Sequence, residues 1–319
     1  MLTTRSVVSI FAAITILLGT GMTSGQNFPN KPIRIVTSVA GGGGDVLARV
    51  IGQGISGPLG QPVIIDNRTN IVLAETVAKA PPDGYTMLLV GDVLWVGPLL
   101  SGKTDTMKDF SPISMLASDS NIVVVHPSLH VTSIKELIAL AKTKPGAPNY
   151  ASGPVGTTNH LAAELFKHMA GVNIVRIPYK GGAPAVVAVL GGQEAQMYFG
   201  NPASFLQHIK SGKLRALAVT SLKRSVVAPD LPTIAESGLP GYEMIGTDSM
   251  FAPAKTPVAV INQLNREIVR FLNTPEAKEK ILSLGAEVVA NSPKEHAEKL
   301  KSKMTILGNI IKAAGITPD

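Results

Sequence analysis

The sequence predicts an α/β protein of two domains, and three observations lead to that prediction. The chain has 319 residues, and a domain typically holds roughly 100 to 200. Apolar, strand-like runs alternate with amphipathic helical segments, which is typical of parallel strands covered by helices. The alternation starts near residue 31 and starts again near residue 149, so each half of the chain is expected to build its own sheet.

The first domain is expected to open with a strand, a glycine loop and a helix. Residues 31–36 form an apolar strand pattern, the run Gly41-Gly42-Gly43-Gly44 follows, and an amphipathic helix pattern begins after the glycines. The remaining elements of this part are expected as a strand at residues 62–65, a helix at 73–79 and a strand at 85–90.

The second domain is expected to repeat the same unit. A strand at residues 121–125 precedes a helix at 133–142, where Ser133 and Glu136 have the spacing of a capping box. Further elements are expected as strands at 149–152, 174–177, 195–199 and 214–220 and as helices at 160–170, 184–191 and 202–211.

The C-terminal third is expected to return to the first domain. It contains three helix patterns, at residues 257–273, 275–284 and 293–314, with a short strand at 287–289. We expect domain I to comprise residues 26–124 and 248–319, and domain II residues 125–247. The chain should cross between the domains near residues 120–126 and 243–252.

Composition excludes several classes of function. The chain has no cysteine, which excludes disulfides, thiolate zinc sites, iron–sulfur clusters and cysteine nucleophiles. Its formal net charge is +7, but the cations are spread singly and aromatic residues make up 4%, which does not favour nucleic-acid binding. The positive charge is better suited to weak steering of an anionic small molecule or to a membrane surface.

The first 25 residues have the three parts of a secretory signal peptide. Arg5 is followed by an uncharged apolar run at residues 7–18 and then by small residues ending at Gly25. The run is shorter than the roughly 20 residues that span a bilayer, so cleavage before Gln26 is expected rather than anchoring. No later segment is long and apolar enough to span a membrane. The mature protein is therefore expected in the periplasm, away from ATP, NAD and nucleic acids.

Three loops are candidates for binding an anion. A helix N-terminus offers unpaired N–H groups and a partial positive charge, and glycines let a ligand approach the backbone closely. The candidate loops are residues 41–45, 152–159 and 181–183, each at the start of a predicted helix. If the first two face one another across an interdomain cleft, they can hold the carboxylates of one ligand. The alternative interpretation is that all three are tight turns.

Motifs for cofactors, metals and catalysis are not found. A dinucleotide fingerprint that starts at Gly41 would need a glycine at Val46, and Gly102-Lys103-Thr104 lacks the earlier glycine of a P-loop. The six histidines show no His-Glu-x-x-His spacing, and no Gly-x-Ser-x-Gly sequence occurs. We therefore predict no cofactor, no metal and no catalytic residue. His160 is expected to cap, pack or position its loop rather than to act as a base.

Several ordered motifs resemble one family of transport receptors. They are Phe28-Pro29-Asn30-Lys31-Pro32, the glycine run before Asp45, Pro82-Asp83-Gly84-Tyr85, Asn149-Tyr150-Ala151-Ser152, Pro178-Tyr179-Lys180-Gly181 and Gly212-Lys213-Leu214-Arg215. Together they are similar to the Bug-type substrate-binding proteins of tripartite tricarboxylate transporters, over residues 28–316. The resemblance implies a periplasmic-binding-protein architecture. Two α/β domains, each with a mainly parallel sheet, would close like a flytrap on a ligand in the cleft between them.

The resemblance also implies a binding site. In such proteins the loop after the first strand and the Ser/Gly/Thr loop of the second domain hold a ligand carboxylate, largely through backbone N–H groups and bridging waters. Carried over to this chain, the predicted ligand-binding residues are Ser38, Ala40, Gly41, Gly42, Gly43, Gly44, Asp45, Ser152, Gly156, Thr157, Thr158, Asn159, His160, Lys180, Gly181 and Asn201.

The chain departs from the family at positions that bear on the ligand. Gly200 stands where an Asp commonly precedes the Asn at 201, and Thr247-Asp248 replaces a common Trp-Phe pair. A missing carboxylate at position 200 removes an acceptor for a ligand ammonium and favours a more negative ligand. The sequence therefore predicts a di- or aromatic carboxylate without an amine.

The predicted function is an extracytoplasmic receptor that performs no covalent chemistry. It is expected to bind a small organic acid and deliver it to the membrane subunits of a transporter of the tripartite tricarboxylate type. One alternative is an exported ligand sensor for a membrane kinase. A less favoured alternative is a periplasmic hydrolase or isomerase, for which His160 and Asp45 are the nearby acid–base candidates.

Overall fold

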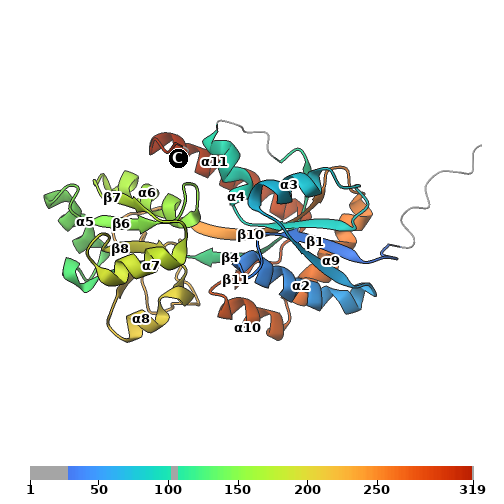
Figure 1. Cartoon of the computed structure of the whole chain (residues 1–319), viewed down its shortest axis with the longest axis horizontal. Coiled ribbons are helices and arrows are strands. Elements are labelled where there is room, and N and C mark those ends of the chain that lie inside the picture. Colours follow the sequence, from blue (N-terminus) through green and yellow to red (C-terminus); the bar gives the residue numbers. More distant parts are fainter. Residues whose placement is uncertain (1–27, 102–106, 318–319) are drawn as a thin grey trace, which may run out of the picture.

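The computed structural model describes residues 28–101 and 107–317, and the predicted signal peptide lies outside them. Two lobes, each with its own sheet and flanking helices, lie side by side along the long axis of the molecule (Figure 1). The lobe that contains β1 is called domain I, and the lobe that contains β6 is called domain II.

Domain I is built on a six-stranded sheet with the order β11-β4-β10-β3-β1-β2. β1 pairs in parallel with β2 and β3, whereas β10 pairs antiparallel with β3 and β4, and β11 pairs antiparallel with β4. The strands are β1 (Ile33–Thr37), β2 (Val63–Asn67), β3 (Thr86–Val90), β4 (Phe110–Ser120), β10 (Ile245–Pro253) and β11 (Glu287–Val288).

Domain II is built on a five-stranded sheet with the order β7-β6-β8-β5-β9. β6 is parallel to β7 and β8, and β5 is antiparallel to β8 and β9. The strands are β5 (Ile122–Val125), β6 (Asn149–Ser152), β7 (Val175–Pro178), β8 (Met197–Gly200) and β9 (Arg215–Val219).

Helices cover the faces of both sheets. In β1, Ile33 and Ile35 belong to the apolar cluster under α2 and α9, while Val36 belongs to the cluster under α3, α4 and α11. The helices are α2 (Gly43–Leu59), α3 (Asn70–Ala78), α4 (Val93–Leu100), α5 (Ile134–Thr143), α6 (Thr158–Ala170), α7 (Gly182–Gly191), α8 (Leu206–Lys210), α9 (Val258–Leu272), α10 (Pro275–Ser283) and α11 (Pro293–Ala313), with short 3₁₀ turns η1 (Pro127–Leu129) and η2 (Pro202–Ser204).

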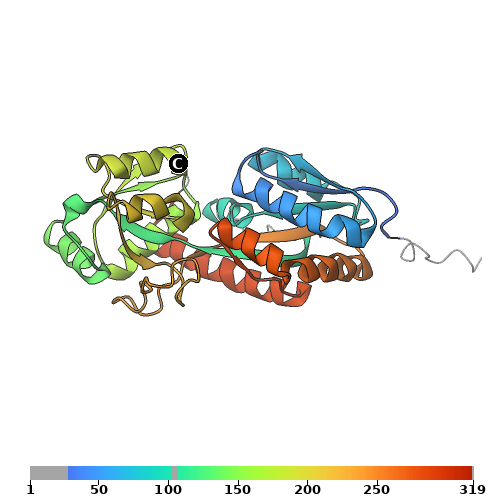
Figure 2. The same ribbon diagram turned by 90° about the horizontal axis from the view of Figure 1, so that it is seen from below.

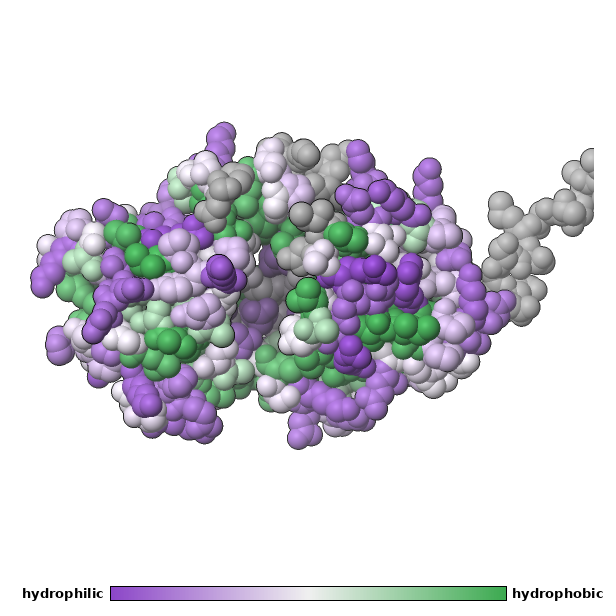
Figure 3. Space-filling view, viewed as in Figure 1, coloured by the Kyte–Doolittle hydropathy of each residue, from purple (hydrophilic) through white to green (hydrophobic). Residues whose placement is uncertain are grey.

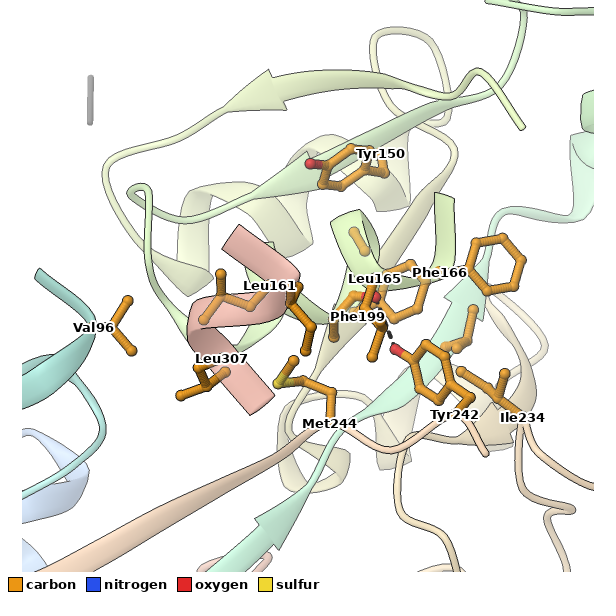
Figure 4. Packing of buried hydrophobic residues seen from close by; sticks show 14 of the residues in the cluster. Val96, Tyr150, Leu161, Leu165, Phe166, Phe199, Ile234, Tyr242, Met244 and Leu307 are labelled. Atoms are coloured by element: carbon orange, nitrogen blue, oxygen red, sulfur yellow. Dashed lines mark hydrogen bonds between the residues drawn. The ribbon is translucent and has the colours of Figure 1, made fainter. Parts of the chain in front are cut away.

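The C-terminal helix α11 joins the two lobes. It contacts β4 and α4 of domain I and α6 of domain II, and it runs across both lobes when the molecule is seen from below (Figure 2). Figure 4 shows Leu307 of α11 beside Leu161 of α6 and Met244, within one cluster of buried residues. The apolar core is therefore continuous across the back of the molecule.

The relative directions of the strands differ from the prediction. Each contains parallel strands next to strand–helix units, as expected, but both sheets are mixed rather than mainly parallel. The reason is that the chain crosses between domains, so β4 and β10 run antiparallel to each other, as do β5 and its two neighbours. β4, β10 and α4 were not predicted, whereas the strand predicted at residues 121–125 corresponds to β5.

The crossings lie within the predicted windows. β4 of the first sheet ends at Ser120 and β5 of the second sheet begins at Ile122, with Asn121 between them. On the return, β10 rejoins the first sheet at Ile245. Each crossing comes three residues before the predicted boundary. β5 begins at residue 122 rather than 125, and β10 begins at residue 245 rather than 248.

None of the helices in the described ranges combines the length and the apolar character needed to cross a membrane.

Candidate functional site

Two adjoining cavities lie between the domains, and the helix starts after the candidate loops line them. The domain I cavity, of about 240 Å³, is lined by Gly43, Gly44, Leu47, Ala117, Asp119, Asn201, Asp248, Ile281, Leu284 and Ala286. The domain II cavity, of about 250 Å³, is lined by Asn121, Thr157, Thr158, Asn159, Gly182, Val186, Tyr198, Gly200, Asn201 and Ser204. Asn201 lines both, and the surface is hollowed between the two lobes (Figure 3).

Two larger hollows lie elsewhere. They have volumes of about 550 and 330 Å³, and both run along α11, with apolar linings that include Leu300 and Leu307. Neither is lined by a residue of the three candidate loops. We place the site in the smaller interdomain cavities because helix N-termini and unpaired polar groups converge there.

The first glycine loop leaves its helix start open. α2 begins at Gly43, its N-cap Gly42 contributes no side chain, and the first intrahelical bond of α2 is donated by the N–H of Val46. Gly43 and Gly44 therefore present N–H groups without an intrahelical acceptor at the wall of the domain I cavity. A Cβ atom at Gly44 would lie 2.8 Å from Ser38 Oγ, so a side chain there would require the Ser38 hydroxyl to move.

Asp45 stabilises the first loop instead of facing a ligand. Its carboxylate accepts the N–H of Gly41 at 2.9 Å and Asn67 Nδ2 at 2.9 Å, and Arg49 lies at 3.0 Å. These contacts, the backbone bond from Gly41 first, lower the pKa of Asp45 to about 2. The carboxylate is thus fully used inside domain I.

The second loop presents polar side chains and another open helix start. Thr157 is the N-cap of α6 but makes no side-chain cap, since its hydroxyl donates to the carbonyl of Pro154 at 2.7 Å and contacts Asn159 Oδ1. Asn159 Nδ2 in turn donates to the hydroxyl of Tyr198. The first N–H groups of α6 are left for another acceptor at the domain II cavity.

Three other predicted residues of the second loop support its shape. The Ser152 hydroxyl donates to the Gly153 carbonyl at 2.9 Å and accepts from Arg176 Nε at 2.7 Å. His160 is buried, and its Nδ1 accepts the N–H of Gly156 at 3.3 Å, which agrees with the predicted positioning role. Gly156 has a positive φ of 83°, and a Cβ atom there would lie 2.9 Å from Val96 of α4.

The third loop contributes less than predicted. Lys180 is exposed and lines neither cavity. α7 begins at Gly182 without a side-chain cap, and Gly182 lines the domain II cavity while its predicted neighbour Gly181 does not. Gly182 belongs to the predicted candidate loop 181–183, although it was not among the ligand-binding residues carried over from the family.

Asn201 connects the two sides of the cleft. Its Oδ1 accepts the N–H of Ala203 at 2.9 Å, and its Nδ2 donates to the carbonyl of Leu284 in domain I at 3.3 Å. Of the predicted residues, the cavities bring together Gly43, Gly44, Thr157, Thr158, Asn159 and Asn201. Ser38, Ala40, Gly41 and Gly42 belong to the first loop but line neither cavity.

Asn121 is the most informative residue that sequence reasoning did not assign to the site. It lies at the first crossing, is 4% exposed, and lines the domain II cavity. Its backbone is held by Thr220 on both sides, yet no described residue accepts a hydrogen bond from its Nδ2. A buried amide donor without a partner is costly, and Asn121 lies at the wall of a cavity in which a ligand can supply an acceptor.

Asp119 and Asp248 were also missed as site residues. Both are partly buried and line the domain I cavity. Burial, followed by repulsion from Asp92, raises the pKa of Asp119 to about 6. Burial, followed by repulsion from Asp119 and Asp92, raises the pKa of Asp248 to about 7. The sequence contained a signal, since Asp248 replaces an aromatic residue common in the resembling family.

Comparison with known proteins agrees with this architecture. Residues 47–316 match the model of the tripartite tricarboxylate transporter family receptor, TctC. BugT of Bordetella pertussis is 34% identical, with 92% of each chain covered. Among solved structures, R. palustris Rpa4515 with adipate has a TM-score of 0.76 at 32% identity, covering 92% of this chain and all of that one. MatC of Rhodopseudomonas palustris with bound malate has a TM-score of 0.74 at 26% identity, covering 89% and 100%.

Two α/β domains with a polar cleft between them define the periplasmic-binding-protein class of solute receptors. Within that class, this chain belongs to the tripartite tricarboxylate transporter receptor family, and the predicted resemblance to Bug-type proteins is confirmed.

Proposed function

We propose that this protein is a periplasmic receptor that binds a small organic carboxylate and delivers it to the membrane subunits of a tripartite tricarboxylate-type transporter. The observation that carries the proposal is the convergence of open helix starts and the Asn121 amide on one interdomain cleft. Adipate and malate in two solved relatives support a carboxylate, and the sequence favours a di- or aromatic one.

Binding is expected to hold the two domains together. A ligand carboxylate can accept N–H groups from α2 on one side and from α6 and Asn121 on the other. Such a ligand binds the closed form better than the open form, and it shifts the population by that difference in affinity. The crossing strands β4 and β10 provide the hinge, with Gly246 paired to Asp119 at the point where they leave domain I.

The geometry argues against acid–base catalysis by the residues first considered for it. Asp45 accepts hydrogen bonds inside its own loop and His160 Nδ1 accepts one from Gly156. A candidate general base needs to reach a substrate proton, and neither Asp45 nor His160 is among the residues that line the two interdomain cavities. A receptor that stops at binding accounts better for the arrangement. A sensor for a membrane kinase would share this site and differ in its membrane partner.

A thermal-shift screen of the purified protein against dicarboxylates, aromatic carboxylates, tricarboxylates and amino acids tests the proposal. A ligand at about 100 times its Kd stabilises by about 2.7 kcal/mol, which raises the melting temperature measurably. The proposal predicts at least one acid that binds and is recovered chemically unchanged. Conversion of that acid would indicate an enzyme, and the absence of any stabilising carboxylate would contradict the proposed function.

A further inference from the structure

We propose that Tyr198 is a specificity-determining residue of the cleft, and that its hydroxyl donates a hydrogen bond to a carboxylate oxygen of the ligand in the domain II cavity. The inference rests on the proposed function, since it takes a carboxylate as the ligand, and it adds a side chain that recognises this group. Sequence reasoning did not assign Tyr198 to the site.

The hydroxyl of Tyr198 lies at the wall of the domain II cavity. Tyr198 is on β8, is 4% exposed and is one of the residues that line this cavity. Its oxygen contacts Asn159 Nδ2, and a Cβ atom added at Gly182 would lie 3.6 Å from the same oxygen. Asn159 of α6 and Gly182 of α7 also line the cavity. The oxygen therefore lies where the starts of these two helices approach each other at the cavity.

This hydroxyl accepts one hydrogen bond and still has its proton to donate. A tyrosine hydroxyl is both a donor and an acceptor. The Tyr198 oxygen accepts from Asn159 Nδ2, and none of the residues in the described ranges accepts its proton. Burial raises the pKa of Tyr198, so the proton stays on the oxygen at neutral pH. A buried donor without an acceptor costs free energy, which a carboxylate oxygen in the cavity would recover.

The second loop holds the Tyr198 hydroxyl in place before a ligand arrives. The Thr157 hydroxyl donates to the carbonyl of Pro154 at 2.7 Å and contacts Asn159 Oδ1, and Asn159 Nδ2 reaches Tyr198. Hydrogen bonds linked in this way polarise one another, which strengthens the donor at the end of the series. Because the donor is already ordered, binding costs little additional conformational entropy.

The charge of the domain II cavity determines which ligand group fits beside Tyr198. None of the side chains that line this cavity is charged. A carboxylate there is bound by neutral donors, and each donor that meets one of its oxygens contributes to affinity. An ammonium has donors and no acceptor, so it would face the Tyr198 proton with a proton of its own. Tyr198 therefore favours a carboxylate over an ammonium at this end of the cleft.

Gly200 makes room for the Tyr198 ring. Residues 198 and 200 are on the same face of β8. A Cβ atom at Gly200 would lie 2.6 Å from Cδ1 of Tyr198 and 2.6 Å from Cε2 of Phe205. The rings of Tyr198 and Phe205 pack with their centroids 5.5 Å apart. A side chain at position 200 is thus incompatible with this position of the ring, and the hydroxyl of Tyr198 supplies a donor at a wall where residue 200 offers no side chain.

Calorimetric titration of the protein with adipate, malate and benzoate tests the inference. Tyr198→Phe keeps the ring and removes the hydroxyl, and it should weaken binding of each acid that binds the wild type by about tenfold. Tyr150→Phe is the matched control. Its hydroxyl is bonded to Glu164 in the same domain, it is buried (Figure 4), and it lines neither interdomain cavity, so affinity should not change.

A double-mutant cycle separates ligand contact from a general effect on packing. Gly200→Ala should displace the Tyr198 ring and weaken binding of the same acids by about tenfold. The double variant Gly200→Ala, Tyr198→Phe should bind no more weakly than Tyr198→Phe alone, because the displaced ring has no hydroxyl to lose. Gly191→Ala, with open space around it, is the control, and melting curves establish that each variant is folded.

Unchanged affinity in Tyr198→Phe, or losses from the two substitutions that multiply, would overturn this inference and leave the proposed function in place. If none of the three acids binds the wild type, both fall.

Discussion

The two cavities of the cleft present groups of opposite character. The domain II cavity lies at the uncapped starts of α6 and α7, and its lining includes Asn121, whose amide donor has no described partner. The domain I cavity is lined by two glycines at the start of α2 and by the carboxylates of Asp119 and Asp248. Asp45 and His160 already have partners and hold their own loops in shape, so we expect a ligand to meet the cavity groups that have none.

Helix N-termini differ in how they are capped. The helices α5, α10 and α11 are closed by Ser133, Thr274 and Ser292, whose hydroxyls accept backbone N–H groups. The helices α2, α6 and α7 have no side-chain cap, and neither do α3, α4, α8 and α9. The starts of α2, α6 and α7 are set apart by their place at the two interdomain cavities, where an anion can accept their N–H groups.

The largest effect is expected at Asn121. Asn121→Leu keeps the size of the side chain and removes its donor, and a hydrogen bond to a charged group contributes about 1.5–3 kcal/mol. Carboxylate affinity should therefore fall about ten- to hundredfold, as measured by calorimetry. Asn173→Leu, at an exposed position, is the control. Equal carboxylate affinity in the Asn121 variant and the wild type would contradict a ligand-binding role for the Asn121 amide at the domain II cavity.

Gly44→Ala should have the next largest effect. The new Cβ atom would lie 2.8 Å from Ser38 Oγ and 3.2 Å from Thr37 Oγ1, at the wall of the domain I cavity. We expect about 1–2 kcal/mol of lost stability together with weaker carboxylate binding. Gly57→Ala, on the same helix with open space around it, should leave affinity unchanged. A Gly44 variant with normal affinity would contradict the placement of the ligand at α2.

Asp119 and Asp248 are expected to make the folded protein less stable as pH rises. The pKa values of Asp119 and Asp248, about 6 and about 7, are raised above the usual 3.8, so the folded state holds protons that the unfolded state releases. The stability that this proton uptake contributes is present near pH 4 and is lost as pH rises through 7. The double variant Asp119→Asn, Asp248→Asn should gain about 1 kcal/mol at pH 8 relative to pH 5. If melting temperatures measured without ligand show no such gain, the raised pKa values of Asp119 and Asp248 would be contradicted.

The smallest effect is expected at His296. This residue tests whether every buried polar group without a hydrogen-bond partner is part of the ligand site. Its ring is buried 4.9 Å from the ring of Phe251, neither ring nitrogen has a described partner, and burial lowers its pKa to about 4. A depressed pKa means that stability is lost as pH falls from about 6.5 toward 4. His296→Leu should reduce that loss by less than about 1 kcal/mol and leave carboxylate affinity unchanged. A change in affinity would extend the site beyond the cleft.

The sequence was sufficient for elements whose signals are local. β1, the glycine loop and α2 follow from an apolar run, four glycines and an amphipathic pattern, and Ser133 with Glu136 placed the start of α5 correctly. It was not sufficient for β4 and β10, because their strand character depends on pairing between segments more than 120 residues apart. The periodicity of apolar residues within one segment does not identify a partner strand so distant in the sequence.

The same reason limited prediction of the site. Gly43, Gly44 and Thr157, which line the cavities, were predicted because loops before helices have a recognisable composition. Asp119 lies on β4 and comes beside Asp248 only when the return strand β10 pairs with β4, and Asn121 lies at the crossing between β4 and β5. Asp45 was assigned to the ligand because its contacts with Gly41 and Asn67 cannot be read from spacing alone.

The most direct test of the account is a crystal structure of the protein with the carboxylate that stabilises it most. We expect carboxylate oxygens within about 3 Å of Asn121 Nδ2 and of N–H groups at the starts of α2 and α6. A ligand bound instead in the apolar hollow along α11, near Leu300, would contradict an interdomain carboxylate site.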